Sequence, residues 1–104
     1  MAGRAVVIDG DTEVADAVTT NLELDGWQVD RVKSMDEARS TIRVKAPELI
    51  VLDIEVPGDT DGVTFCKELR ADPRLFGSAI IVLTVRGQST DKVSAFDAGA
   101  DDYV

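Results

Sequence analysis

Two stretches of the chain are apolar almost throughout and too short for helices. They cover residues 49–53 and 79–84, each ending in one polar residue, and a shorter apolar run covers residues 5–8. Unbroken apolar runs rich in Ile and Val predict strands buried on both faces, as at the centre of a parallel sheet. Residues 27–32 alternate apolar and polar side chains, which predicts a half-exposed edge strand. Residues 101–104 resemble the start of a fifth strand.

The segments between these strands have the spacing and the end signals of helices. Val14, Val18 and Leu22 recur every four residues within 12–25, and Gly26 is a plausible helix stop. Ser34 followed by a glutamate three residues later is a capping box, and Asp61 and Ser89 can cap further helices. The three later helices are predicted to carry Met35, Ala38 and Ile42, then Val63, Cys66 and Leu69, then Val93 and Phe96 on their inner faces.

Strands and helices therefore alternate along the chain, with connections that allow only local crossovers. This pattern predicts an α/β fold, a doubly wound parallel sheet covered by helices on both faces. The 104 residues suffice for one domain with its own core, and we find no internal repeat or interdomain linker.

Composition narrows the function classes. The net charge of −9 argues against direct nucleic-acid binding and favours a cation or a basic docking surface. The single cysteine, Cys66, excludes an internal disulfide, indicates a reducing, cytoplasmic setting, and is expected to be a buried structural thiol. The chain has no histidine, so imidazole metal sites and His-based catalysis are ruled out within it. We expect no membrane segment and no secretory signal.

Polar residues stand at the carboxyl end of three predicted strands. Asp9 and Asp11 follow the first strand, Asp53 ends the third, and Thr84 ends the fourth. Because open α/β sheets bind ligands at this edge, we expect these side chains to converge. Carboxylate oxygens suit Mg²⁺, and a carboxylate can act as a nucleophile toward phosphorus.

A simpler interpretation stays open at this point. Asp9 and Asp11 could merely cap the first helix, and Asp53 could be a solvated residue at a strand end. Motifs of other sites are missing, since the sequence has no Gly-rich phosphate loop, no serine elbow and no cysteine pair for zinc.

Four segments in this order resemble the receiver domain of response regulators in two-component signalling. They read VVIDGD, LIVLDIEVPGDTDG, AIIVLTVRG and AFDAGADDYV, and the resemblance covers nearly all of residues 1–104. It implies a flavodoxin-like five-stranded parallel sheet of order 2-1-3-4-5, with the family's last helix absent from this chain.

The resemblance also implies roles for single residues. Asp53 resembles the phosphate-accepting aspartate, and Asp9 resembles the first residue of the acidic pair that organises Mg²⁺. Glu55 stands where the family provides a backbone carbonyl to the metal. Thr84 resembles the switch hydroxyl, and Tyr103 resembles the aromatic residue that changes rotamer with it.

Two departures from the family pattern matter. Gly10 stands at the second acidic position, so we expect weakened Mg²⁺ affinity unless Asp11 or the Glu55 side chain compensates. The sequence also stops before the family's lysine and fifth helix, and we therefore expect it to be a piece of a longer response regulator.

The leading hypothesis is a phosphoryl-accepting switch rather than an enzyme. A partner histidine kinase would supply the phosphoryl group to Asp53 with Mg²⁺, and the change would pass to an output domain or a second copy of the chain. The alternative is a pseudo-receiver, a protein-interaction module that keeps the fold without phosphorylation, and Gly10 favours it. A phosphohydrolase of similar topology, with Glu55 as a second carboxylate, is a third reading that the ending around residues 98–103 disfavours.

Overall fold

The computed structural model describes residues 3–9, 13–53, 55–83 and 102–103, the last two by their backbone alone. The elements in chain order are β1 (Arg4–Ile8), α1 (Glu13–Leu24), β2 (Gln28–Val32), α2 (Met35–Val44), β3 (Leu49–Asp53), α3 (Gly62–Ala71), the short 3-10 helix η1 (Pro73–Leu75), β4 (Ala79–Leu83) and β5 (Asp102–Tyr103). The elements predicted within the described residues are therefore present, and the helix predicted over 89–99 lies outside them.

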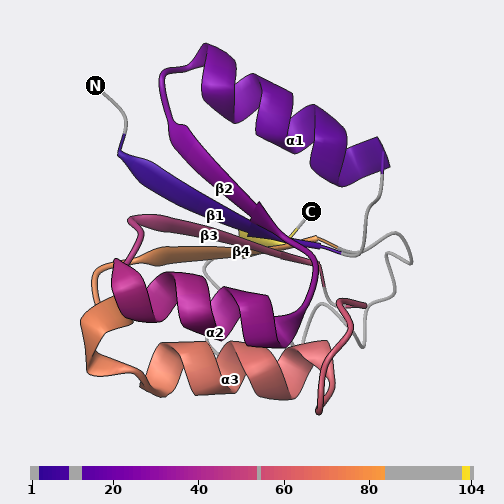
Figure 1. The fold of residues 1–104 in the computed structure, drawn as a ribbon, viewed down its shortest axis with the longest axis vertical. Coiled ribbons are helices and arrows are strands. Elements are labelled where there is room, and N and C mark those ends of the chain that lie inside the picture. Colours follow the sequence, from indigo (N-terminus) through magenta and orange to yellow (C-terminus); the bar gives the residue numbers. More distant parts are fainter. Residues whose placement is uncertain (1–2, 10–12, 54, 84–101, 104) are drawn as a thin grey trace.

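The five strands form one parallel sheet in the order β2-β1-β3-β4-β5. This confirms the predicted order and the place of β2 at an edge. Figure 1 shows α1 on one face of the sheet and α2 and α3 together on the other. Parallel neighbours must be joined by crossover connections, and here helices on both faces of the sheet provide them (Figure 1), which gives the doubly wound architecture.

Each face of the sheet carries its own apolar core, because successive strand residues point to opposite faces. Val7 and Val51 pack on the side of α1. Ile50 and Leu52 pack on the side of α2 and α3, where Phe65 is fully buried. The apolar runs of β1 and β3 are unbroken because helices cover both faces of these strands. Burial of each such side chain contributes about 2 kcal/mol to the free energy of unfolding.

The buried face of α1 includes only two of the three apolar residues whose spacing predicted the helix. Val14 is 44% exposed, and the buried residue of the helix is Ala15. Val18 and Leu22 pack against the core. A helix turns once in 3.6 residues, so three residues spaced by four drift around the axis, and Ala15 replaces Val14 on the buried face.

Gly26 ends α1 as predicted, and its backbone explains why glycine stands there. Its φ is +93°, in the left-handed region. The Gly26 N–H donates to Glu23 O and the Trp27 N–H donates to Leu22 O, both at 3.0 Å. These two bonds are the Schellman pattern that satisfies the last carbonyls of a helix.

The predicted caps of α2 and α3 are confirmed. The Ser34 side chain accepts a hydrogen bond from the Glu37 N–H at 3.2 Å. The Asp61 carboxylate accepts from the Thr64 N–H at 2.8 Å, which lowers the pKa of Asp61. Both contacts satisfy backbone donors that the first helical turn leaves unpaired.

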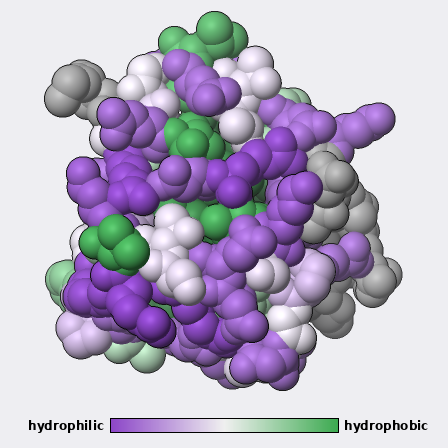
Figure 2. Space-filling view, viewed as in Figure 1, coloured by the Kyte–Doolittle hydropathy of each residue, from purple (hydrophilic) through white to green (hydrophobic). Residues whose placement is uncertain are grey.

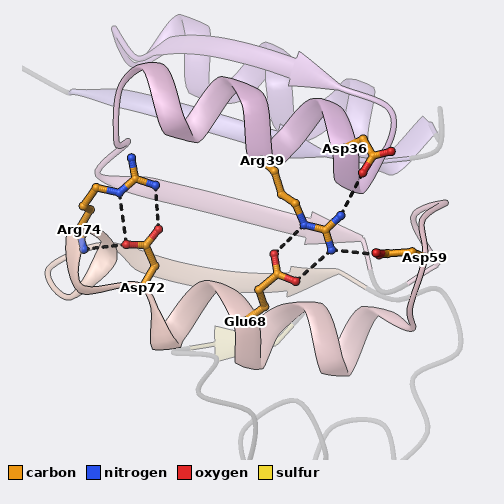
Figure 3. A network of polar contacts seen from close by, with 6 residues as sticks. All are labelled: Asp36, Arg39, Asp59, Glu68, Asp72 and Arg74. Carbon is orange, nitrogen blue, oxygen red and sulfur yellow. Dashed lines mark hydrogen bonds and ion pairs between the residues drawn. The ribbon is translucent and has the colours of Figure 1, made fainter.

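Arg39 joins α2 to α3 and to the loop after β3, as Figure 3 shows. Its guanidinium lies 2.7 Å from Glu68 and 3.0 Å from both Asp36 and Asp59, and it stacks 5.1 Å from the centroid of the Phe65 ring. The hydrogen bond to Glu68 is the main cause of a raised Arg39 pKa, and the hydrogen bond from Arg39 is the main cause of a lowered Asp59 pKa. The loop that follows Asp53 is therefore fastened to α2.

Hydrophilic side chains cover most of the face seen in Figure 2. The large hydrophobic residues found most exposed, Leu24, Val44 and Phe76, come from three different elements or loops. Cys66 is buried, as predicted. None of the described helices is long and apolar enough to cross a membrane.

Replacing Gly26 by alanine is expected to lower the free energy of unfolding by about 1 kcal/mol, because a Cβ is strained at positive φ. Urea unfolding followed by circular dichroism measures the difference. Gly77→Ala is the matched control, since a Cβ there meets nothing within 4 Å and its φ is not positive. Equal losses in the two variants would show that the backbone conformation is not the cause.

Arg39→Gln is expected to reduce stability at pH 7 more than at pH 3. The folded-state pKa of Asp59 is lowered by Arg39, so this contribution is present above the unfolded pKa of about 4 and is lost as pH falls through the folded value. The measurement compares urea midpoints of the variant and the parent at both pH values. Arg43→Gln is the control, because it removes the same charge from α2 outside the network. If its loss of urea midpoint depended on pH as strongly as that of Arg39→Gln, the Arg39–Asp59 pair would not be the cause.

Candidate functional site

Asp53 ends β3, the strand that pairs with β1 on one side and with β4 on the other. Its side chain is half-buried, and its Oδ1 accepts a hydrogen bond from the Glu55 N–H at 2.9 Å. The Val56 N–H donates to the Asp53 carbonyl at 3.1 Å. These bonds turn the chain out of the strand and orient the carboxylate at the edge of the sheet.

Asp9 follows β1 directly and is completely buried. Its N–H donates to the Val32 carbonyl at 3.0 Å, which extends the pairing of β1 with β2 by one step. Its Oδ2 lies 2.9 Å from Nη2 of Arg31. A buried carboxylate is costly without a positive partner, and the Arg31 guanidinium supplies that charge.

The register of the sheet brings Asp9 and Asp53 to the same place. Ile8 pairs with Leu52, so each aspartate is the next residue on neighbouring parallel strands. Val7 and Val51, two residues earlier on each strand, both belong to the core on the side of α1. The alternation of a strand therefore directs the two carboxylates to that side of the sheet edge. The predicted convergence of these two residues is supported.

Arg31 was not foreseen as a site residue. It pairs with Val7 in the sheet and reaches both Asp9 and Asp16, an acidic residue in the first turn of α1. Its pKa is raised, mainly by the hydrogen bond to Asp16 and then by the charge of Asp9. The only signal in the sequence is a basic residue near the end of an edge strand, and pairing with Asp9 depends on the register of β2 against β1.

The other predicted site residues are described in part or not at all. Glu55 is exposed, and its N–H donates to Asp53. Tyr103 lies in β5, where its backbone pairs with Val82. Asp11 and Thr84 lie outside the described residues, as does Gly10.

The donor set at this edge suits Mg²⁺ in its chemistry. Mg²⁺ prefers oxygen, commonly binds one or two carboxylates and keeps several waters, and Asp9 and Asp53 are two carboxylates on neighbouring strands. In the described part of the chain, no three Asp, Glu, Cys or His side chains gather closely enough to hold a metal by themselves. Asp9 also pairs with the Arg31 guanidinium, so a metal at this carboxylate would have to share it with Arg31 or displace Arg31 from it.

The loop after Asp53 is positioned by α2. Val56 is buried, and the Met35 N–H donates to the Pro57 carbonyl at 2.9 Å. A Cβ on Gly58 would lie 2.2 Å from the Met35 sulfur, so the loop backbone approaches the helix closely. Residues 55–61 thus have a fixed path from the sheet edge to the start of α3.

Comparisons with known proteins give relatives along the whole chain. It is 38% identical over 101 residues to the DNA-binding dual master transcriptional regulator RpaA of Synechocystis, covering 97% of this chain and 42% of that protein. It is 34% identical over 104 residues to the phosphate regulon transcriptional regulatory protein PhoB of Rhizobium meliloti, covering 100% of this chain and 45% of that protein. The chain therefore spans less than half the length of these curated relatives.

Solved structures show the same fold. A protein described as a response regulator from Chloroflexus aurantiacus superposes with a TM-score of 0.90 at 33% identity, covering 100% of this chain and 84% of that one. The BeF3-activated N-terminal receiver domain of RstA from Klebsiella pneumoniae superposes with a TM-score of 0.84 at 29% identity, covering 97% of this chain and 83% of that one. The sequence model of the response regulator receiver domain matches residues 5–104. The chain belongs to the response regulator receiver domain family.

Proposed function

We propose that this receiver domain accepts a phosphoryl group on Asp53 from a partner histidine kinase, with Mg²⁺ bound at Asp9 and Asp53. The observation that carries the proposal is the place of Asp53, which ends the central strand β3 beside the carboxylate that follows β1. Receiver domains are signalling domains, and phosphoryl acceptance is general for the family. We therefore assign this chain a switching role and no enzymatic turnover.

The chemistry needs one nucleophilic oxygen with a fixed direction. A carboxylate oxygen of Asp53 attacks phosphorus in line, the new P–O bond forms as the P–N bond to the donor imidazole breaks, and the electron pair returns to that nitrogen. The Glu55 N–H on Oδ1 holds the carboxylate in position for this attack. When bound, Mg²⁺ neutralises the charge that develops on the phosphoryl oxygens.

We propose Thr84 and Tyr103 as the residues that respond to the phosphoryl group. Leu83 pairs with Asp53 across β3 and β4, so Thr84 is the next residue beyond that pair. Tyr103 belongs to β5, which pairs with β4. A hydroxyl that moves toward a new phosphoryl group would bias the segment after β4 between two arrangements.

The partners are part of the same proposal. The relatives are more than twice as long as the matched region, which supports an output domain elsewhere in the full protein. The signal would pass to that domain or to a second copy of this chain. We place the domain in the cytoplasm with its kinase partner, and the net charge of −9 supports a role without direct nucleic-acid contact.

One observation favours the pseudo-receiver alternative. Arg31 already neutralises Asp9, and Gly10 offers no second carboxylate at the position after it. A domain in this state could dock partners through its fold alone. The two functions differ in whether Asp53 is modified.

Incubating the protein with acetyl phosphate and Mg²⁺ is expected to add one phosphoryl group, detected by intact-mass spectrometry. Asp53→Asn is expected to abolish the mass gain, because the amide is not a nucleophile toward phosphorus. The matched control is Asp25→Asn, which changes an exposed aspartate beyond the end of α1 and should label like the parent. An unlabelled parent protein would instead support the pseudo-receiver.

A further inference from the structure

We propose that Arg31 is a built-in cation that competes with Mg²⁺ for the Asp9 carboxylate and so sets the affinity of the site for the metal. The inference rests on the proposed function in one respect, since it takes Asp9 as a ligand of Mg²⁺. It goes further by assigning a residue of β2 to the control of that site.

The first argument is the burial of Asp9. Its side chain is 0% exposed, and the Nη2–Oδ2 distance of 2.9 Å is that of a charge-assisted hydrogen bond. A carboxylate removed from water this completely needs a compensating cation. The metal-free domain therefore holds a positive charge close to the carboxylate that would bind Mg²⁺.

The second argument is the second partner of Arg31. Its Nη1 pairs with Asp16 of α1, whose side chain is 59% exposed, while that of Arg31 is 30% exposed. The guanidinium thus bridges a buried carboxylate and a solvated one. When Mg²⁺ takes Asp9, the guanidinium can remain paired with Asp16, so the exchange does not leave Arg31 without an anion.

The third argument is electrostatic. A guanidinium and a divalent cation at one carboxylate repel each other, and in a partly buried site this repulsion weakens metal binding by about tenfold or more. This loss of metal affinity should come only from a cation at this edge of the sheet, next to Asp9. Arg4 offers the comparison, because it also links β1 to β2, through Asp30, but belongs to the start of β1.

The test is calorimetric titration of the metal-free protein with MgCl2. Arg31→Gln is expected to bind Mg²⁺ about tenfold more tightly than the parent, because the competing charge is gone. Arg4→Gln removes the same charge from the same pair of strands and is expected to shift the affinity less than about twofold. Equal shifts in the two variants would overturn the inference, because net charge alone would then explain them.

A second pair of variants keeps the test valid if Arg31→Gln does not fold without metal. Asp16→Asn leaves Arg31 on Asp9 but removes its solvated partner, so Mg²⁺ should bind several-fold more weakly than to the parent. Asp30→Asn is its control, since it removes the corresponding partner of Arg4. An Asp16→Asn affinity equal to that of Asp30→Asn would contradict the competition.

The acetyl phosphate reaction separates this inference from the proposed function. Tighter Mg²⁺ binding in Arg31→Gln with no labelling of Asp53 would support the competition and reject the phosphoryl-accepting role. Labelling of Asp53 together with equal Mg²⁺ affinity in Arg31→Gln and Arg4→Gln would support the phosphoryl-accepting role and reject the competition. Absence of Mg²⁺ binding in both the parent and Arg31→Gln would also overturn the inference.

Discussion

A carboxylate buried as completely as that of Asp9 must be matched by a positive charge, and the site depends on which charge that is. In the structure it is the guanidinium of Arg31, held between Asp9 and Asp16. The carboxylate is therefore not a solvated strand end. It is one half of an ion pair at the edge where β1 and β3 end together.

The register of the sheet places this ion pair at the same edge as Asp53. Parallel pairing of β1 with β3 puts Asp9 and Asp53 at the same level, and the register of β2 brings Arg31 to the same edge. The loop after Asp53 is then fastened to α2 by the Pro57 carbonyl and the Arg39–Asp59 pair. A rigid frame of this kind lets a small change at one carboxylate be passed to neighbouring elements.

Much of the fold could be predicted because its determinants are local. The apolar run before Asp53, the cap at Ser34 and the stop at Gly26 each reflect a preference of a short segment, and each is confirmed. The strand order came from the resemblance to receiver domains, since periodicity alone does not fix it. The spacing of Val14, Val18 and Leu22 predicted the first helix correctly but not its buried face, because four-residue spacing drifts around a helix and Ala15 is the residue buried against the sheet.

The site was predictable only where it follows directly from strand ends. Asp9 and Asp53 end neighbouring strands, and the rule that such ends converge sufficed to pair them. Arg31 lies 22 residues from Asp9 in the sequence, and alternation in β2 indicates only that it is polar and near an edge. Which residues Arg31 pairs with depends on the register of β2 against β1 and on the position of α1, and local sequence patterns do not determine these features of the tertiary structure.

If Mg²⁺ binds at Asp9, as we propose, the same ion pair links metal binding to folding. A ligand that binds only the folded state stabilises it according to its affinity, and that affinity includes the cost of displacing whatever already occupies the site. With Arg31 on Asp9, that carboxylate is already compensated without a metal, so Mg²⁺ would add less to the stability of the domain than at a site where two carboxylates face each other unneutralised. The Asp9 carboxylate is therefore neutralised in this fold without a metal. Under the proposed function, a metal would be needed when further negative charge arrives at Asp53, and Arg31 would hold the neighbouring carboxylate neutralised until then.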